Sequence, residues 1–572
     1  MTSKPADRAR GWWRPIPAWV ARRPGYTLPG SVAALVFACL SFTPSLLPRP
    51  AAFQGLVTGV SAAIGYGLGV LGARVWREFA DRPPRRPGPA SWRRYGVAAA
   101  LSLVISLGLG LWWQREAAAL VGVEPEPLLA WVLVLPVAAL LLVALVGGAR
   151  LVVRGYLRLA RWLALHMGAR AARALGVVLV VVAAFLTLNG VLGNAAITVV
   201  NSAFSVRDAT TQEGVTRPAT GDRSGGPGSL VPWESLGFQG RTFVARGPNA
   251  ALIEEATGTP AKNPIRAYAG LDSADDAEAR AALAVRDLER AGGFERSRLL
   301  VVTTTGTGWV EPSAVSAFEY LSDGDSAIVS MQYSFLPSVV SFLVDQERAR
   351  DAGRALFDAV YERWITLPPD ARPRIYVFGE SLGSFGGETA FSGEYDMANR
   401  ISGALFTGAP NFNPLYRSFV DHRDPGSREV EPVYRAGRTV RFTTSPGAPI
   451  EPSGQPWDRA RVLYLQHASD PITWWSPDLV LHRPDWLTEE RGDDVLGATR
   501  WIPFVTFWQV SADMPLSMEP GPGHGHNFSG EHVDAWAAIL QTPDWSADRA
   551  ARLKEVVRAR LTEPYAATPP SS

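Results

Sequence analysis

A serine flanked by glycines follows a short apolar run in the last third of the chain. Residues 374–383 read Arg-Ile-Tyr-Val-Phe-Gly-Glu-Ser-Leu-Gly, which places Ser381 in a Gly-x-Ser-x-Gly pattern. A strand ending in this pattern can turn sharply into a helix and expose the serine oxygen as a nucleophile, because the glycines leave room at a crowded turn. With 54 glycines in 572 residues, an accidental match has a chance of roughly one in four, so the interpretation depends on the partners of the serine.

A nucleophilic serine needs a histidine as general base and a carboxylate that orients the histidine. After an elbow of this kind, the expected chain order is serine, acid, histidine. Asp470 follows the apolar run that starts at Arg461, so it lies at the carboxyl end of a predicted strand. Asp470-Pro471 is also compatible with an ordinary turn, and that alternative stays open. Glu388 and Asp513 are poorer candidates for the acid because of their positions.

Two histidines lie in a glycine-rich segment before the predicted closing helix. Residues 519–530 read Glu-Pro-Gly-Pro-Gly-His-Gly-His-Asn-Phe-Ser-Gly. Glycine on both sides of a histidine lets the loop curl toward a serine. We favour His524 as the base, because Gly-x-Gly-His-Gly is similar to the arrangement around the base of many serine hydrolases, and His526 is the alternative. The segment lacks a convincing third metal ligand, so we expect no metal and no cofactor.

The oxyanion of an acyl-transfer reaction needs backbone N–H donors near the serine. One donor is expected from Leu382, which follows the nucleophile, and another from a loop after an earlier strand. Thr-Gly306-Thr307-Gly-Trp follows the apolar run 299–303 and could supply that second donor. A phosphate-binding loop is a weaker interpretation, because the Gly-Lys-Ser/Thr ending is absent from the sequence.

The N-terminal part of the chain contains apolar stretches of about the length that crosses a bilayer, roughly 20 residues. Charged residues are essentially absent inside them, and fully apolar helices in series are rare in soluble bundles. We therefore predict a membrane domain at 29–200, after a basic N-terminus at 1–28. The predicted spans are 29–47, 53–73, 96–113, 127–148 and 174–197.

Arginines are concentrated in alternate connections between these stretches. Short cytoplasmic loops retain positive charge, so the arginine-rich connections are expected inside the cell. With five spans, everything after the last one would be extracytoplasmic; an even number of spans would weaken this prediction. The arginines that define the inside loops are Arg8, Arg10, Arg14, Arg22 and Arg23, then Arg74, Arg77, Arg82, Arg85, Arg86, Arg93 and Arg94, then Arg150, Arg154, Arg158, Arg161, Arg170 and Arg173.

Apolar runs alternate with helical patterns after a polar, Gly/Pro-rich segment. We interpret 201–230 as a flexible linker, 231–561 as an α/β domain with a mostly parallel sheet and helices on both faces, and 562–572 as a disordered tail. The predicted strands are 241–246, 265–269, 299–304, 326–333, 374–379, 402–407 and 461–467, with another possible strand at 503–510. The predicted helices are 275–291, 314–321, 338–365, 382–392, 531–540 and 546–561.

Composition narrows the functional class. Lys and Arg together number 56 against 54 acidic residues, so the net charge of +2 argues against a nucleic-acid partner. The single cysteine, Cys39, cannot form an intrachain disulfide. Aromatic residues near predicted strand ends would suit an acyl chain, although ordinary core packing is the simpler explanation for them. These residues are Trp309, Phe335, Trp474 and Trp475.

The chain resembles the membrane-bound α/β-hydrolase proteins of mycobacteria and other actinobacteria. The resemblance rests on Gly-Glu-Ser381-Leu-Gly-Ser and Gly-His524-Gly-His526-Asn, covers most of the chain, and implies an α/β-hydrolase fold with Ser381 as nucleophile. We expect a membrane-anchored serine hydrolase that forms an acyl-enzyme and acts on lipid-like or cell-envelope esters. An envelope acyltransferase and a non-enzymatic membrane scaffold or lipid-binding protein are the alternatives. The expected partners are the lipid bilayer and a lipid-like or acylated small-molecule substrate, and the sequence does not identify any protein partner.

Overall fold

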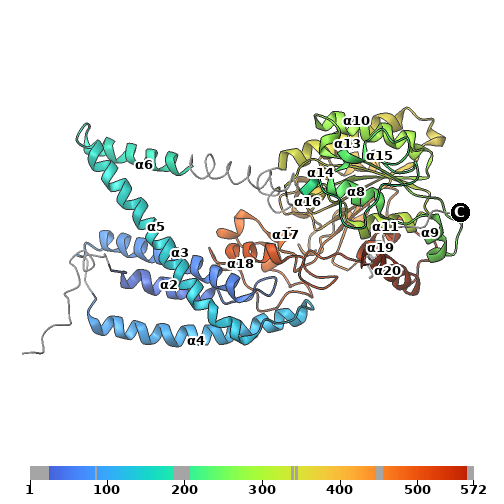
Figure 1. Cartoon of the computed structure of the whole chain (residues 1–572). Coiled ribbons are helices and arrows are strands. Elements are labelled where there is room, and N and C mark those ends of the chain that lie inside the picture. Colours follow the sequence, from blue (N-terminus) through green and yellow to red (C-terminus); the bar gives the residue numbers. More distant parts are fainter. Residues whose placement is uncertain are drawn as a thin grey trace, which may run out of the picture.

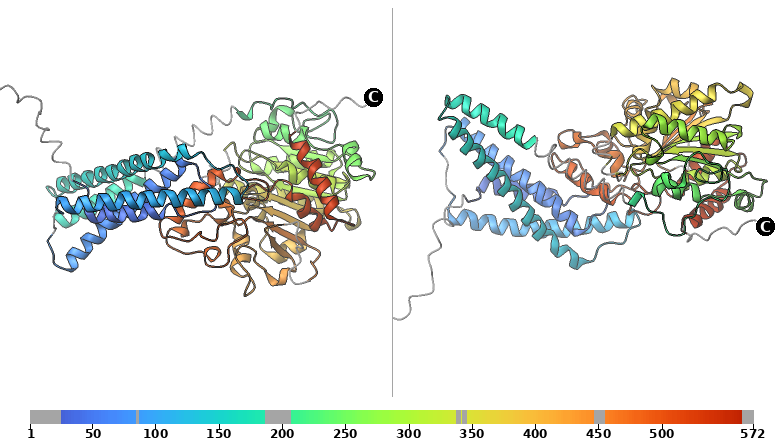
Figure 2. Two further views of the ribbon diagram at one scale, coloured as in Figure 1. Left: turned by 90° about the horizontal axis from the view of Figure 1, so that it is seen from below. Right: turned by 45° about the horizontal axis from the view of Figure 1, so that its top comes forward.

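The computed structural model describes residues 25–83, 87–185, 207–336, 341, 346–445 and 455–562. Long N-terminal helices lie beside a layered α/β domain, and the helices run away from one end of that domain (Figures 1 and 2). The helical part comprises α2 (Leu28–Leu40), α3 (Ala51–Phe79), α4 (Pro89–Leu120), a 3-10 turn η1 (Leu128–Leu133), α5 (Val134–Leu163) and α6 (Ala169–Phe185).

Three helical stretches are long and apolar enough to cross a membrane: Ala51–Phe79, Pro89–Leu120 and Leu128–Leu163. Many of their apolar side chains face outward; Leu101, Val104 and Leu140 are 62%, 68% and 73% exposed. An apolar surface of this extent is unusual for a soluble protein and is typical of contact with a membrane or a partner. These helices indicate association with a membrane.

The first and last predicted spans differ from the three long ones. Helix α2 has only 13 residues, so it rises about 20 Å against a hydrocarbon core of about 30 Å. Pro44, Pro48 and Pro50 lie in the non-helical segment that follows α2, so the predicted span 29–47 is helical only in its first part. The span predicted at 174–197 is covered by α6 as far as Phe185, and its remainder lies outside the described residues.

A parallel sheet of seven strands forms the centre of the C-terminal domain, in the order β1-β3-β2-β4-β5-β7-β6. Its strands are buried along almost their whole length, as expected for a sheet covered on both faces. The sheet confirms the predicted α/β-hydrolase fold class. The strands are β1 (Ile265–Ala269), β2 (Arg298–Thr303), β3 (Ser326–Met331), β4 (Arg374–Glu380), β5 (Gly403–Thr407), β6 (Val440–Thr443) and β7 (Arg461–Leu465).

Two apolar cores lie on opposite faces of the sheet. One core packs α10 (Ala277–Arg290), α13 (Gln346–Ile365), α14 (Leu382–Glu388), α15 (Glu394–Arg400) and α16 (Pro414–Asp421) against the strands. The other packs α8 (Gly237–Ala245), α9 (Ala250–Thr257), α11 (Pro312–Tyr320), α19 (Glu531–Leu540) and α20 (Ala547–Thr562). Both cores immobilise the strands whose carboxyl ends carry the candidate site residues.

Two predicted strands are helices. Residues 241–246 lie almost entirely in α8, where Phe243 and Val244 both join the core and Phe243 packs on Tyr268 of β1. Residues 503–510 enter α18 (Thr506–Asp513). Short apolar runs do not separate strand from helix by periodicity alone, and tertiary packing decides between them. The strand β6, which pairs with β7 at the sheet edge, was missed.

The predicted linker is packed rather than extended over its described part, 207–230. Ser224 N donates to Arg266 O and Arg266 N donates to Asp222 O, so this segment lies along β1. The buried Arg223 guanidinium donates to the carbonyls of Val244, Arg246 and Pro248. These bonds anchor a segment whose composition alone suggested flexibility. The first residues of the predicted linker, 201–206, and the tail, 563–572, lie outside the described residues.

An irregular segment, 471–516, connects β7 to the histidine loop. It contains α17 (Pro471–Trp474) and α18, and it lies between the sheet and the long helices (Figure 1). Its core includes Trp474, Trp486 and Leu516, together with Leu46, Leu47 and Val121 from the helical part. The two parts of the chain therefore share one apolar cluster.

Candidate active site

Ser381 lies in a tight turn between β4 and α14. Its φ and ψ angles are +52° and −125°, a region that non-glycine residues rarely occupy. Ser381 N donates to Thr407 O over 2.9 Å, which ties the turn to the end of β5. A Cβ atom on Gly379 would lie 2.4 Å from Gly383 O, and one on Gly383 would lie 2.4 Å from Thr303 O. The glycines are therefore required by the close approach of backbone that forms this elbow.

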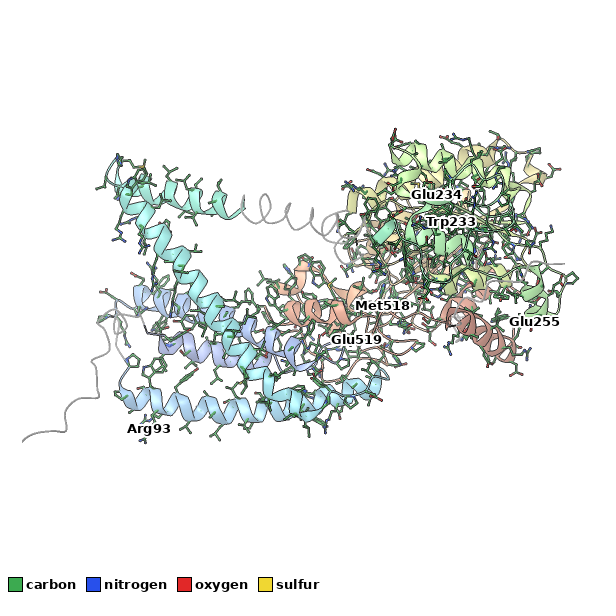
Figure 3. The ribbon with its side chains drawn as sticks, in the orientation of Figure 1. Arg93, Trp233, Glu234, Glu255, Met518 and Glu519 are labelled. Carbon is green, nitrogen blue, oxygen red and sulfur yellow. The ribbon has the colours of Figure 1, made fainter. Side chains whose placement is uncertain are left out.

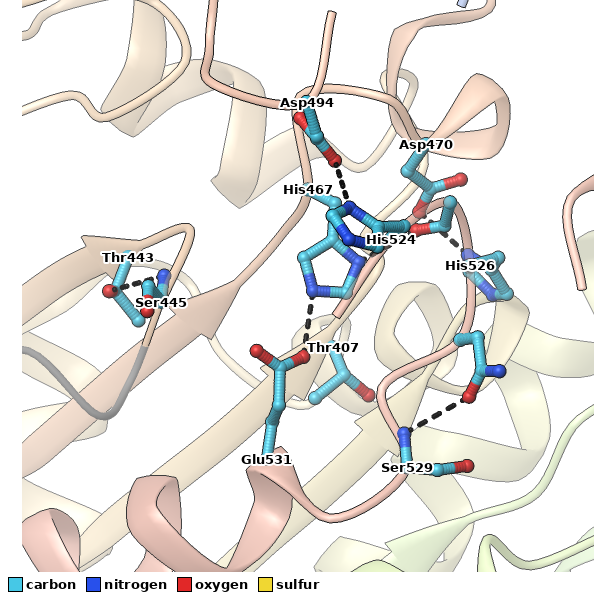
Figure 4. Close-up of polar contacts among 12 residues, drawn as sticks. Thr407, Thr443, Ser445, His467, Asp470, Asp494, His524, His526, Ser529 and Glu531 are labelled. Atoms are coloured by element: carbon cyan, nitrogen blue, oxygen red, sulfur yellow. Dashed lines mark hydrogen bonds and ion pairs between the residues drawn. The ribbon is translucent and has the colours of Figure 1, made fainter. Parts of the chain in front are cut away.

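Asp470 is fully buried just beyond the carboxyl end of β7. Its carboxylate caps α17 by accepting from Ile472 N at 2.8 Å and from Thr473 Oγ1 at 3.1 Å. The same carboxylate lies 2.7 Å from His526 Nδ1 (Figure 4). A carboxylate held by its own helix cap is a rigid acceptor that fixes the orientation of the imidazole.

The His526 ring lies against Gly408, just beyond the end of β5 that bonds the serine elbow. A Cβ atom on Gly408 would lie 2.3 Å from His526 Cε1, and Gly408 directly follows Thr407, whose carbonyl receives the Ser381 N–H. The side chain of His526 is only 7% exposed. Its Nε2 atom is buried and has no hydrogen-bond partner among the described residues. This nitrogen, on the side of the ring away from Asp470, is therefore an available proton acceptor.

The sequence-based preference for His524 is not supported by the hydrogen bonds. His524 is 32% exposed, and its Nδ1 lies 3.5 Å from Asp494 rather than next to Asp470. The reason lies in Gly525, which has a φ of +56°. Gly525 N donates to Ser469 Oγ at 2.8 Å, and Gly525 O lies 2.8 Å from His467 Nδ1. These bonds to the end of β7 turn the neighbouring His526 toward Asp470.

Opposing effects act on the pKa of His526. Burial disfavours the imidazolium and lowers its pKa. The charge of Asp470, its hydrogen bond and the charge of Glu380 raise it, and their sum exceeds the effect of burial. The pKa of His526 therefore lies above the ordinary value of 6.5, which makes this histidine a stronger base.

Of the predicted oxyanion donors, Leu382 begins the helix after the elbow, and Gly306 and Thr307 lie in the loop that follows β2. Leu382 N is the first amide of α14, and Gly383 packs on the carbonyls of Thr303 and Thr304 at the end of β2. The loop containing Gly306 and Thr307 closes through Gly308 N, which donates to Thr305 O over 2.9 Å. Within the described residues, the amides of Leu382, Gly306 and Thr307 donate no hydrogen bond. All three amides are therefore available as donors.

The other acids considered from the sequence have structural partners. Glu388 accepts from Leu415 N at 3.1 Å and from Tyr416 N at 3.2 Å, so it caps α16. Burial raises its pKa to about 7, against the lowering effect of those hydrogen bonds. Asp513 accepts from Leu46 N at the junction with the long helices. No group of three His, Cys, Asp or Glu side chains among the described residues is placed to hold a metal ion.

A second polar cluster, not predicted from the sequence, lies buried behind the elbow. Ser313 Oγ is 2.7 Å from His532 Nδ1, and Ser313 also donates to Glu311 over 2.6 Å. His532 Nε2 is 3.3 Å from Glu380, which also accepts from Thr407 Oγ1 at 3.1 Å. Burial, with the nearby charge of Glu380, raises the pKa of Glu311. Ser313 and His532 are at most 1% exposed, so this cluster is part of the packing behind the elbow.

The charge of Glu380 gives a testable pH effect. In Glu380→Gln, loss of the negative charge removes one cause that raises the pKa of His526. With His526 as a general base for Ser381, only the neutral imidazole could accept the serine proton, so we expect the acid limb of a kcat/KM profile to shift to lower pH. Profiles of the wild type and Glu380→Gln measure the shift, and melting curves control for stability. An unchanged acid limb in a folded variant would contradict a link between Glu380 and the base.

Comparison with known proteins gives two matches that together span most of the chain. Residues 265–553 match the model of an alpha/beta-hydrolase family, and residues 42–248 match the model of that family's N-terminus. The chain belongs to the α/β-hydrolase family. The expected α/β-hydrolase membership is thus confirmed, and the N-terminal helices are part of the family architecture.

Other comparisons add little for this α/β-hydrolase. A search of curated proteins found no match. Among solved structures, an acetylxylan esterase determined at 0.90 Å resolution is similar, with 16% identity and a TM-score of 0.20. The match covers 31% of this chain and 85% of the esterase.

Proposed function

We propose that this α/β-hydrolase is a membrane-anchored serine hydrolase that uses Ser381, His526 and Asp470 as a catalytic triad. The observation that carries the proposal is the 2.7 Å hydrogen bond between His526 and the buried Asp470, beside the strained turn of Ser381. A serine nucleophile, a histidine base and a carboxylate that orients the base occur here in the chain order typical of this fold. His526 takes the role for which His524 was preferred from sequence.

The reaction is transfer of an acyl group to water. Ser381 Oγ attacks the ester carbonyl carbon while its proton moves to His526 Nε2. The tetrahedral oxyanion receives hydrogen bonds from Leu382 N and from the Gly306–Thr307 loop. His526 then protonates the departing alcohol, which leaves an ester on Ser381. Water, deprotonated by His526, attacks that ester; the imidazolium then returns the proton to Ser381 Oγ as the acid is released.

The proposed substrates are lipid-like or cell-envelope esters. The segment between β7 and the histidine loop exposes large apolar side chains, among them Leu481 at 59%, Trp508 at 37% and Met518 at 55%. Figure 3 places Met518 and Glu519 where the long helices approach the hydrolase domain. Exposed apolar residues beside membrane helices favour substrates from the lipid phase. The aromatic candidates divide, since Trp474 is fully buried in the core while Trp475 is partly exposed.

The proposed location of the hydrolase domain is outside the cytoplasm. Arg93 lies at the end of α4 farthest from the hydrolase domain (Figure 3), and Arg150, Arg154 and Arg158 lie in the second half of α5. Both helices have their other ends near the hydrolase domain (Figure 1). The rule that positive loops remain inside supports an extracytoplasmic site.

Covalent labelling tests the function. A fluorophosphonate is expected to modify Ser381, so the adduct should be found on the tryptic peptide that follows Arg374 and ends at Arg400. Ser381→Ala and heat-denatured wild type serve as controls and should remain unlabelled. A membrane-impermeant form of the probe, applied to intact cells, tests the orientation by the same readout. Folded wild type without an adduct at Ser381 would contradict the proposed function.

A further inference from the structure

The loop between α2 and α3, residues 41–50, docks on α18 and its surroundings. Asp513, the last residue of α18, accepts from Leu46 N at 3.2 Å and from Leu47 N at 3.4 Å. Gln509 Nε2 donates to Thr43 O over 2.8 Å. Thr499 Oγ1 donates to Ser45 O over 3.3 Å. The helical part therefore contacts the hydrolase domain through several side chains and not through the covalent connection alone.

A buried ion pair lies at the centre of this contact. Arg49 Nε is 3.6 Å from Asp513 Oδ1, and both side chains are 0% exposed. Two charges removed from water destabilise a protein strongly when one partner is lost. The loop is also fixed from the membrane side, because Arg49 N donates to Gln114 over 2.6 Å and Ala51 N donates to Glu126 over 2.6 Å. Asp513 is thus held against a loop with a fixed conformation.

A short chain of contacts leads from this ion pair to the base. Asp513 is followed by the 3-10 turn Met514–Leu516, and the next residue, Ser517, accepts the His526 N–H at 2.7 Å. The histidine loop has a second support, because Gly521 N donates to Val121 O at the end of α4 over 3.1 Å. The backbone of His526 is therefore bonded to Ser517, in a segment that the helical part holds in place. Gly521, in the same loop as His526, is bonded directly to the residue that follows α4.

The acid rests on the same contact surface. Leu46, Leu47 and Val121 belong to the apolar cluster that contains Trp474, the last residue of the helix capped by Asp470. Trp474 is fully buried, and its Nε1 donates to His467 O over 3.0 Å. Packing from the membrane side thus stabilises the turn that holds the carboxylate.

We propose that two connections of the helical part, 41–50 between α2 and α3 and 121–127 between α4 and η1, are positioning elements of the His526–Asp470 pair, with Arg49 as the main positioning residue. The inference rests on the proposed function and extends it, because the helices then contribute to catalysis as well as to anchoring. Displacement of reacting groups by about 1 Å can slow an enzyme about a hundredfold. A change in the contact between these connections and the hydrolase domain is therefore expected to change the rate.

The test uses the full chain in detergent micelles with a soluble p-nitrophenyl ester. In Arg49→Met, we expect kcat to fall about tenfold to a hundredfold with KM changed by less than about threefold, because the base is misplaced while the substrate surface remains. The acid limb of the pH profile should also move, since displacement of His526 changes the effects of burial and of Asp470 on its pKa. Arg49→Lys, which retains the charge, should recover part of kcat.

Arg266→Met is the matched control, because it breaks another buried ion pair, with Glu319 at 2.6 Å, on the edge strand β1. It should reduce stability without moving the acid limb. Leu47→Ala gives a milder disturbance of the same contact if Arg49→Met does not fold. A folded Arg49→Met or Leu47→Ala with wild-type kcat and acid limb overturns the inference, as does an equal effect in Arg266→Met. Those outcomes leave Ser381 labelling of the wild type intact, whereas failure of that labelling contradicts the proposed function itself.

Discussion

Replacement of His526 by glutamine is expected to lower kcat for ester hydrolysis by about four to six orders of magnitude, the effect seen when a triad base is removed. Glutamine cannot accept the proton of Ser381, although it is polar and of similar length. His524→Gln should retain kcat within about threefold, because His524 is paired with Asp494 and partly exposed. Steady-state turnover of a soluble ester by both purified variants measures the difference.

The two histidines are well matched as a pair of variants, because they lie two residues apart in one loop and receive the same substitution. Ser381→Ala provides the baseline, and the double variant Ser381→Ala with His526→Gln should lose no more than either single change, as members of a triad act together. A large loss in His524→Gln combined with a small loss in His526→Gln would reverse the assignment of the base.

The choice between the histidines shows where sequence reasoning stops. Glycines on both sides of His524 indicate a flexible loop, but flexibility does not tell which ring faces the acid. The orientation of the His526 ring is set by hydrogen bonds between Gly525 and two residues, His467 and Ser469, that lie more than 50 positions earlier in the chain. Contacts of this range leave no local pattern. The elbow and the strand-end position of Asp470 are local patterns, because each depends on residues next to a strand: Ser381 follows β4 directly, and Asp470 precedes α17 just beyond β7.

The fold shows the same division. Six of the predicted strands correspond to β1–β5 and β7, because strands buried on both faces appear as continuous apolar runs between helical patterns. The run at 241–246 was assigned wrongly, since packing of Phe243 on Tyr268 favours a helix there. The segment 207–230 looked flexible because the three carbonyl acceptors of Arg223 cannot be identified before the fold is known.

The junction with the helices was also outside the reach of the sequence. From sequence, Asp513 is a poor candidate for the catalytic acid, and Arg49 is absent from the arginines that define the predicted inside loops. Their pairing joins residues separated by more than 460 positions, and both side chains are excluded from solvent. A buried charged side chain is expected to have a partner of opposite charge, but the sequence alone does not identify that partner.

Replacement of Asp470 by asparagine is expected to lower kcat by about four orders of magnitude, with little effect on folding. Asparagine is also a good helix N-cap, so the bond from Ile472 N that begins α17 can be kept. The amide has no negative charge and can donate to His526 Nδ1, which would leave the proton on Nε2 and block the transfer from Ser381. The free energy of unfolding of Asp470→Ala should be about 1 kcal/mol lower than that of Asp470→Asn, because alanine removes the helix cap.

The pH profile of Asp470→Asn separates catalysis from structure. Asp470 raises the pKa of His526 by its charge and its hydrogen bond, so the neutral variant should have a lower histidine pKa. The residual activity should then extend to lower pH than that of the wild type, since the imidazole stays unprotonated further into the acid range. Turnover measured from acid to alkaline pH gives both kcat and the position of the acid limb. A kcat that stayed high, or one that fell while the acid limb did not move, would show that Asp470 does not orient the base or raise its pKa. Asp494, the neighbour of His524, would then be tested as the acid.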